Sequence, residues 1–423
     1  MTRHEAPGRA AFIFIFVTVA LDMLALGVIV PVLPKLIVEF EAGDIASAAA
    51  VSGVFGTVWA AMQFLGSPLL GALSDRFGRR PVILLSNLGL GLDYGLMALA
   101  PTLHWLLVGR VISGFTSASF STAAAYITDV TPPERRAAQF GMLGAAFGLG
   151  FVVGPAVGGL LGEVSLRLPF WVAGGLSLAN ALYGALILPE SLPPERRAPF
   201  AWRRANPLGS LRLLSSHPEL LGLAAATFLY FVAHEVLPGV TVLYVDYRYG
   251  WGEAAVGLVL AAVGVCSTVV SAALVGPAVQ RLGERRALLV GLGFGTAGFA
   301  AYGLAPTGAL FMAGVPLVAL WGLSGPAMQS LMSRHIGPSE QGQLQGALSS
   351  MRGITGMIGP LVFTQTFAAA IDPNSRVQLP GAPYLLAALL LVGALVLSLR
   401  VTRGRRPPTV DLSPETPGAR DMS

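Results

Sequence analysis

Long apolar runs, each about the length of a membrane-spanning helix, alternate with short polar breaks along the chain. A helix needs about 20 mostly apolar residues to cross a bilayer, and continuous runs favour helices over the alternating strands of a barrel. The chain holds twelve such runs, six on each side of a polar stretch at 189–217. They cover 10–32, 47–70, 81–100, 103–127, 138–162, 168–188, 219–245, 254–279, 286–304, 307–333, 342–370 and 382–401.

The composition supports the same interpretation. Of the 423 residues, 54% are hydrophobic and 12% are charged, whereas about 25% are charged in a soluble globular protein. The mean hydropathy is +0.69. So few charges cannot cover the surface of a soluble fold of this length. The composition therefore excludes disorder, argues against a soluble enzyme, and predicts an all-α membrane protein with twelve transmembrane helices.

The positions of the basic residues predict the orientation of these helices. Of the 27 Lys and Arg residues, 21 lie in the N-terminus, the tail, the 189–217 stretch and the even-numbered loops, and the other side has only Lys35, Arg167, Arg248 and Arg376. Because basic residues favour the cytoplasmic side, we expect both termini in the cytoplasm. A basic surface for nucleic acid is the rival explanation of the net charge of +5, but the topology accounts for it, and we expect no nucleic-acid partner.

The two halves of the chain share a pattern at one offset of 205 residues. The matching residues are Gly71 and Gly276, Arg76 and Arg281, Gly78 and Gly283, Arg80 and Arg285, Gly141 and Gly346, and Gly154-Pro155 and Gly359-Pro360. Such parallel repeats place a substrate site between the halves near the membrane midplane. The predicted domains are an N-terminal six-helix bundle (1–188), a cytoplasmic linker (189–217), a C-terminal six-helix bundle (218–401) and a disordered cytoplasmic tail (402–423).

At these residues the sequence resembles the major facilitator superfamily. The segment from Gly71 to Pro81 is similar to its signature loop, and the stretch from Gly148 to Gly159 is similar to the motif of its drug exporters. Within the family the chain most resembles the drug/proton antiporters of the tetracycline-resistance type. The other matching segments are Leu21-Asp22 to Pro34, Gln63, Asp93-Tyr94, Gly109-Arg110, Ala125 to Asp129, and Gln341 to Gly346. The resemblance implies a twelve-helix exporter of drug-like molecules driven by inward proton flow.

Four positions depart from that group's pattern. The tetracycline exporters carry a His in helix 8 and an Asp in helix 9 for proton coupling, and this chain has Ser267 and Gly295 there. It has Glu235 where the group has Gln, and Arg352 where the group has a small polar residue. The resemblance therefore carries over the fold and the polar residues of the first half. It does not carry over the coupling residues of the second half, and it leaves open whether tetracycline is the cargo.

Ionisable residues within the first four runs are candidates for proton coupling, because a charge inside a bilayer is costly and is seldom kept without a role. Asp22 lies midway along the first run among apolar residues, where the charged form of a carboxyl is disfavoured. Asp93 lies in the third run, and Arg110 is the expected positive partner of either carboxylate. The alternative for both aspartates is a structural hydrogen bond to a neighbouring helix.

A second group of polar residues lies in the seventh, tenth and eleventh runs. Glu235 precedes Pro238-Gly239, a predicted kink, and we expect it to replace the missing coupling groups of the second half. The alternative is that His234 and Glu235 reach toward the outer surface. Arg352 is expected to pair with Glu235 or with an anionic substrate. The residues predicted to line a substrate cavity are Gln63, His234, Gln329 and Arg352, with helix packing as the alternative for both glutamines.

The loop after the second run is predicted to form a cytoplasmic gate. Asp75 is expected to face a helix N-terminus. The arginines of the loop are expected to pair with Asp129 or Glu134 when the gate closes. A simple topology anchor is the alternative. The gate residues are Gly71, Asp75, Arg76, Gly78, Arg79, Arg80 and Asp129.

Glycines of the fifth run allow neighbouring helices to approach closely and slide. This motif comprises Gly150, Gly154, Pro155, Gly158 and Gly159. A role in gating or in preventing leaks follows from the resemblance and not from the glycines alone.

Three functional hypotheses remain after this survey. The first is a proton-coupled exporter of drug-like molecules, with tetracycline as one candidate. The second is a transporter of the same fold that carries a metabolite, with Arg352 as an anion contact. The third, a membrane enzyme or receptor, has no catalytic constellation to support it. We expect a monomer in a bacterial inner membrane that uses the proton gradient, with no metal or other cofactor and with small molecules, protons and lipid as its partners.

Overall fold

The computed structural model describes residues 6–117, 119–199, 209–337, 340–375 and 378–402, and within these ranges it consists of helices joined by turns and loops, with no strand. This confirms the all-α prediction. The helices of the first half are α1 (Ala6–Ile29), α2 (Leu33–Phe40), α3 (Ile45–Phe77), α4 (Arg79–Leu99), α5 (Leu103–Thr116), α6 (Ser119–Val130), α7 (Pro133–Val164) and α8 (Leu168–Ile187). Those of the second half are α9 (Arg212–Ser216), α10 (Pro218–His234), α11 (Val236–Tyr249), α12 (Glu253–Val269), α13 (Val275–Leu282), α14 (Glu284–Leu304), α15 (Gly308–Leu320), α16 (Ser324–Ser333), α17 (Gln341–Ile371) and α18 (Ala382–Thr402).

The helices agree with the predicted membrane spans. Eleven helical segments in the described residues are long and apolar enough to cross a membrane. The twelfth predicted span, 103–127, is divided between α5 and α6, which have 14 and 12 residues and are each too short to be counted. The span count of the sequence is therefore approximately that of the structure.

Two local features modify the uniform spans, and the second agrees with the kink predicted at Pro238-Gly239. The segment after the first span is not a loop but the short helix α2, which has a proline at its start. The seventh span is interrupted at Glu235, between α10 and α11. Pro238 explains this interruption: it has no N–H to donate to the carbonyl of His234, where α10 ends.

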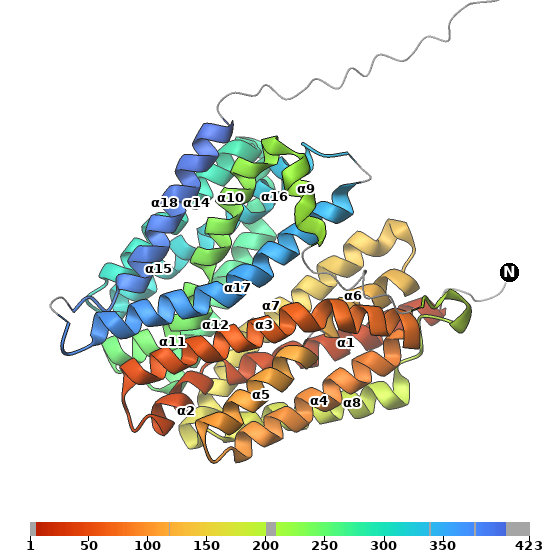
Figure 1. Cartoon of the computed structure of the whole chain (residues 1–423), viewed down its shortest axis with the longest axis horizontal. Coiled ribbons are helices and arrows are strands. Elements are labelled where there is room, and N and C mark those ends of the chain that lie inside the picture. The colour runs from red at the N-terminus through yellow and green to blue at the C-terminus, as the bar shows by residue number, and fades with distance from the viewer. Residues whose placement is uncertain (1–5, 118, 200–208, 338–339, 376–377, 403–423) are drawn as a thin grey trace, which may run out of the picture.

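Each half of the chain packs largely on itself (Figure 1). In the first half α1 packs against α7 and α8, and α4 packs against α8 and α5. In the second half α14 and α10 both pack against α18, and α14 also packs against α15. We call the face where α1 begins and α18 ends the terminal face, and the opposite face the distal face.

Two long helix pairs join the halves. The first is α3 with α17, and the second is α7 with α12. In the α3–α17 pair, Gly53 lies against Thr364, Gly56 against Pro360, and the Thr57 hydroxyl donates to the Met357 carbonyl at 2.7 Å. Small residues at the contact allow the backbones to approach closely.

Both pairs separate toward the terminal face. Along α7, Gly159 lies against Gly257 of α12, and the Cβ position of Gly148 lies 3.5 Å from the Thr268 hydroxyl oxygen. No atom of a neighbouring helix lies within 4 Å of the Cβ position of Gly144. Along α3, contact with α17 continues to Phe64, but no atom of a neighbouring helix lies within 4 Å of the Cβ position of Gly71. The helices of the two halves therefore pack together at the distal face and diverge toward the terminal face (Figure 1).

Some predictions lie outside the described residues. The tail at 403–423 and part of the 189–217 linker, 200–208, are among them. The predicted domain boundaries stay predictions.

Candidate functional site

Asp22 is buried in a network of side-chain amides between α1, α4 and α8. The amide of Asn180 on α8 donates to Asp22 Oδ1 at 2.9 Å and to the Thr18 carbonyl at 2.9 Å. With its nitrogen toward Asp22, the amide of Asn87 on α4 donates to both carboxylate oxygens at 3.1 Å, and its oxygen accepts from Asn180 at 3.0 Å. Asp22 therefore has partners on two neighbouring helices, as the structural alternative requires, and proton coupling there stays a prediction.

Asp93 and Arg110 form a second buried charged group, between α4 and α5. The charge of Arg110 acts on the Asp93 carboxylate, which lies against the backbone at Gly109. Arg110 also points Nη2 at the Met97 sulfur, at 3.4 Å. Of the two candidates for its negative partner, Asp93 is the one on which the charge of Arg110 acts, and Asp22 is surrounded by amides. Among the described residues no ion pair within 4 Å joins Arg110 to either carboxylate.

A third polar group lies where α10 ends and α11 begins, beside α17. It consists of His234, Glu235 and Arg352. The Glu235 side chain packs against Gly359 of α17. The Arg352 guanidinium lies over the Phe231 ring, 4.7 Å from its centroid, and its charge acts on both His234 and Glu235. In the described part of the chain, no carboxylate lies within 4 Å of Arg352. The guanidinium is exposed and is held by an aromatic ring.

Aromatic rings that the sequence did not single out line this group. The Trp321 ring, between α15 and α16, lies 4.5 Å from the ring of Tyr230 and 5.8 Å from that of His234. Trp321 is buried in the core of the second half, whereas the half-buried rings of Tyr230 and Phe231 lie at the edge of this group. We call Tyr230, Phe231, His234, Glu235, Trp321 and Arg352 the aromatic–ionic cluster.

The two predicted glutamines lie near this cluster but make different contacts. Gln329 on α16 is exposed and donates to Gln345 of α17 at 3.0 Å. Gln63 on α3 is half-buried, and its neighbour Phe64 packs against Gly353, next to Arg352. The four predicted cavity residues therefore lie on α3, α10, α16 and α17, and His234 and Arg352 are the two that are close enough for the charge of one to act on the other.

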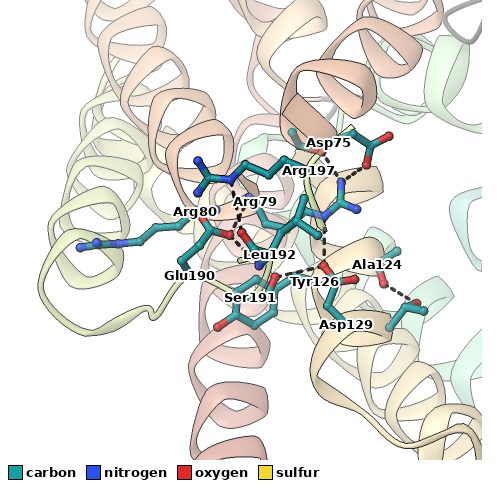
Figure 2. Close-up of polar contacts among 12 residues, drawn as sticks. Asp75, Arg79, Arg80, Ala124, Tyr126, Asp129, Glu190, Ser191, Leu192 and Arg197 are labelled. Atoms are coloured by element: carbon teal, nitrogen blue, oxygen red, sulfur yellow. Dashed lines mark hydrogen bonds and ion pairs between the residues drawn. The ribbon is translucent and has the colours of Figure 1, made fainter. Parts of the chain in front are cut away.

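At the terminal face, Arg79 is the centre of the predicted gate (Figure 2). Its Nε donates to Asp129 Oδ2 at 3.1 Å, and its Nη1 donates to Asp75 Oδ1 at 2.5 Å and to Ser74 Oγ at 2.7 Å. All three partners belong to the first half. Arg79 thus makes the pairing with Asp129, but it does so within the first half while the two halves are apart at this face, so this ion pair does not by itself close the terminal face as predicted. Arg80 instead donates to the Ala185 carbonyl, and Arg76 lies over the Phe77 ring.

The acidic residue at the start of α4 is Glu190 and not, as predicted, Asp75. The Glu190 carboxylate accepts from the backbone N–H groups of Arg79 at 2.9 Å and Arg80 at 3.3 Å (Figure 2). These N–H groups have no partner inside the helix, and the positive end of the helix dipole favours an anion there. Gly78 leaves room for the carboxylate: its φ is +105°, and a Cβ would collide with Glu190.

Residues at the start of the linker also bind to residues of the predicted gate. Ser191 donates to Asp129 Oδ2 at 3.2 Å, and the Ala198 N–H donates to the Asp75 carbonyl at 3.0 Å. The sequence analysis treated 189–217 as a polar connection and missed these contacts. The available signal was an acidic residue just after the sixth span, which can reach a helix N-terminus.

The second half has the same ion pair with its charges exchanged. Arg79 and Asp129 correspond, 205 residues later, to Glu284 and Arg334. Arg334 Nη2 lies 2.6 Å from Glu284 Oε1, which also accepts from the Ser330 hydroxyl at 2.6 Å. The terminal ends of the two helix pairs α4–α6 and α14–α16 are thus tied in the same manner, by pairs of opposite polarity.

The glycine motif of α7 is a joint between three helices. One face packs on α1: Gly150 lies against Met23, Gly154 against Gly27, and Gly158 against Val28. The other face packs on α12, where Gly159 and the Pro155 carbonyl both lie against Gly257. The motif therefore supplies part of the contact that joins the two halves.

Comparisons with known proteins agree with this architecture. The family model described as "Major Facilitator Superfamily" matches residues 15–360. The chain is 38% identical over 380 residues to the tetracycline resistance protein, class C, of Escherichia coli, covering 90% of this chain and 95% of that protein. It is 36% identical over 388 residues to the class G protein of Vibrio anguillarum, covering 88% of this chain and 95% of that protein.

Solved structures show the same fold. A bacterial homologue of the human lysosomal transporter Spinster, in an inward-facing and unoccupied conformation, superposes with a TM-score of 0.75 at 19% identity, covering 94% of this chain and 98% of that one. The nucleoside transporter NupG superposes with a TM-score of 0.73 at 14% identity, covering 93% of this chain and 100% of that one.

Proposed function

The chain belongs to the major facilitator superfamily, and from this premise we propose that it is a proton-coupled transporter that exports drug-like small molecules. The observation that carries the proposal is its identity of 38% to a tetracycline resistance protein over 90% of the chain. Tetracycline is therefore the first cargo to test. We place the protein in a bacterial inner membrane as a monomer, with both termini in the cytoplasm.

The arrangement of the halves supports transport by alternating access. They touch at the distal face and are open at the terminal face. With cytoplasmic termini, this is the inward-open state. Rocking one half against the other about the α3–α17 and α7–α12 contacts would close the terminal face and open the distal one.

The surroundings of Asp22 support a role in carrying protons. A charged Asp22 needs donors, which Asn180 and Asn87 provide. A protonated Asp22 needs an acceptor, and Asn87 can supply its amide oxygen by turning its side chain over. The same site can thus satisfy both protonation states, which a purely structural carboxylate would not require.

In the second half we propose that Glu235 takes the coupling role. Ser267 of α12 and Gly295 of α14 stand where the tetracycline exporters have ionisable groups, and neither can bind and release a proton at neutral pH. Glu235 lies at the interruption between α10 and α11, and the charge of Arg352 acts on it. It can therefore exchange a proton for an interaction with Arg352 or with cargo.

One observation favours a second candidate, the transport of a metabolite anion. The exposed Arg352 guanidinium lies over Phe231 and, among the described residues, has no carboxylate within 4 Å. An anionic cargo could supply that carboxylate, and the neighbouring half-buried rings of Tyr230 and Phe231 would contact a planar cargo. In this case Arg352 would be the cargo contact.

The experiment is drug efflux from a sensitive bacterial host that lacks its own exporters. Cells producing wild type should survive tetracycline, or another drug of a chemically varied panel, and lose this resistance when a protonophore is added. Glu235→Gln, which cannot release a proton, should reduce resistance to the level of the empty host. Glu39→Gln, which neutralises an exposed carboxylate on α2, is the matched control and should behave as wild type.

The outcomes separate the two candidates. If the wild type gives resistance to none of the drugs in the panel, drug export is contradicted and the metabolite carrier becomes the favoured candidate. Resistance that persists in Arg352→Ala would exclude Arg352 as an essential cargo contact. Resistance that persists in Glu235→Gln would contradict the proposed coupling role of Glu235.

A further inference from the structure

We propose that Lys35 is the latch that holds the distal face closed, by joining α2 of the first half to α11 and α12 of the second. Opening of that face in the transport cycle must break its contacts. The proposal rests on the alternating-access part of the proposed function and not on the identity of the cargo.

The contacts of Lys35 cross between the halves. Its ammonium lies 3.4 Å from Asp246 Oδ1 on α11 and 3.3 Å from Glu253 Oε1, at the start of α12. It also donates to the Trp251 carbonyl, between these two helices, at 2.9 Å. All three acceptors lie more than 200 positions away in the sequence, so the contacts join the halves and do not stabilise α2 itself.

Burial distinguishes this cluster from an ordinary surface ion pair. The Lys35 side chain is 7% exposed, and those of Asp246 and Glu253 are 27% and 25% exposed. Isolated surface ion pairs contribute little, because water and salt screen them. Removing one partner of a buried pair is costly, because the other charge remains without compensation.

The surrounding packing places Lys35 at the junction itself. Val38, one turn further along α2, packs against the apolar cores of both halves. Glu253 lies against Gly162 of α7, at the distal end of the α7–α12 contact. Opening the distal face would therefore separate Val38 from one core and Lys35 from its carboxylates at the same time.

The charges of the latch predict that its lysine and its carboxylates differ in importance. One cation faces two carboxylates, so loss of either carboxylate still leaves Lys35 one ion pair. Loss of Lys35 leaves two like charges on the second half and no link to α2. The single carboxylate variants should therefore have small effects, and Lys35→Met and the double carboxylate variant should have large ones.

The test uses full-length purified protein with Cys266 replaced by Ser and a reporter cysteine at Val38. The rate at which a charged maleimide labels Val38→Cys reports how often the distal face opens. We expect Lys35→Met to raise this rate about tenfold or more, as loss of a buried ionic contact should. Lys35→Arg, Asp246→Asn and Glu253→Gln should each stay within about twofold of the wild-type rate.

Two controls separate opening from damage. Arg248→Met removes an exposed positive charge near Asp246 and should leave the Val38→Cys rate unchanged. A second reporter, Ala98→Cys, is buried in the core of the first half at the distal end of α4, and it should stay protected in Lys35→Met. If Lys35→Met does not fold, the double variant Asp246→Asn/Glu253→Gln provides the same test.

Either of two results would overturn the proposal. One is an unchanged Val38→Cys rate in the Lys35→Met or double variant. The other is an equal increase at Val38→Cys and Ala98→Cys, which would mean local unfolding in place of opening. Because the readout is labelling and not drug resistance, failure of the latch and failure of the proposed drug export can be told apart.

Discussion

An Asp22→Asn variant should fold normally and lose proton-driven efflux. The new amide oxygen can accept from Asn180 and Asn87 as the carboxylate does, and its NH₂ can donate to the Asn180 side-chain oxygen, which has no partner in the described structure. The hydrogen-bond network between α1, α4 and α8 is then kept, but the site can no longer bind and release a proton. Resistance in cells should fall to that of the empty host, with unchanged protein level and melting temperature.

A second variant, Asp22→Ala, measures how much the hydrogen bonds of Asp22 contribute to the stability of the protein. It removes the acceptor of both amides and leaves their donors unsatisfied in a buried site, which costs about 2–3 kcal/mol. We therefore expect it to melt at a lower temperature than Asp22→Asn. Protonophore-sensitive efflux that persists in Asp22→Asn would contradict a coupling role, and a loss of stability alone in both variants would assign Asp22 to helix packing.

The second large effect is expected at the glycine joint of α7. Gly158→Val should destabilise the protein by about 3 kcal/mol or more, because its Cβ would collide with the backbone carbonyl of Val28 and one helix would have to move. In a thermal melt of the purified protein this should appear as a decrease of about 5 °C or more.

Gly141→Val is the matched control for this variant. It places the same β-branched side chain in the same helix, where nothing lies within 4 Å of the Cβ position. The loss of helix propensity is then common to both variants, and the difference between their melting temperatures measures packing alone. Equal melting temperatures would mean that close approach of α1 and α7 is not needed for stability.

The sequence predicted the helices well because the signal for a membrane span is a composition, and composition can be read along one chain. The twelve apolar runs follow directly from this local composition. The 205-residue repeat follows from matching residues at a fixed offset, which also needs only the one chain. The helix α2 was missed because its eight residues are too short for a membrane span, although Pro34 is well accommodated in the first turn of a helix. The interruption of the seventh span after His234 could be predicted from Pro238, because a proline disturbs only the helical turn that precedes it.

The partners of the candidate residues could not be predicted, because they are set by which helix faces meet. Asn87 and Asn180 are neutral residues inside apolar runs, and only the packing of α4 and α8 on α1 brings them to Asp22. Glu190 was missed because its signal, one acidic residue just after the sixth span, does not show which helix N-terminus the side chain reaches. The Glu284–Arg334 pair was hidden because its charges are exchanged relative to the first half, so a search for matching residues passes over it.

The most direct test of proton-coupled export is a measurement of proton movement in lipid vesicles that contain the purified protein and a trapped pH-sensitive dye. Adding a cargo to the outside creates an inward cargo gradient, and an antiporter must then move protons outward in exchange. The account predicts that the vesicle interior becomes more alkaline with wild type and does not change with Asp22→Asn. Cargo entry without a pH change, or with acidification of the interior, would contradict it.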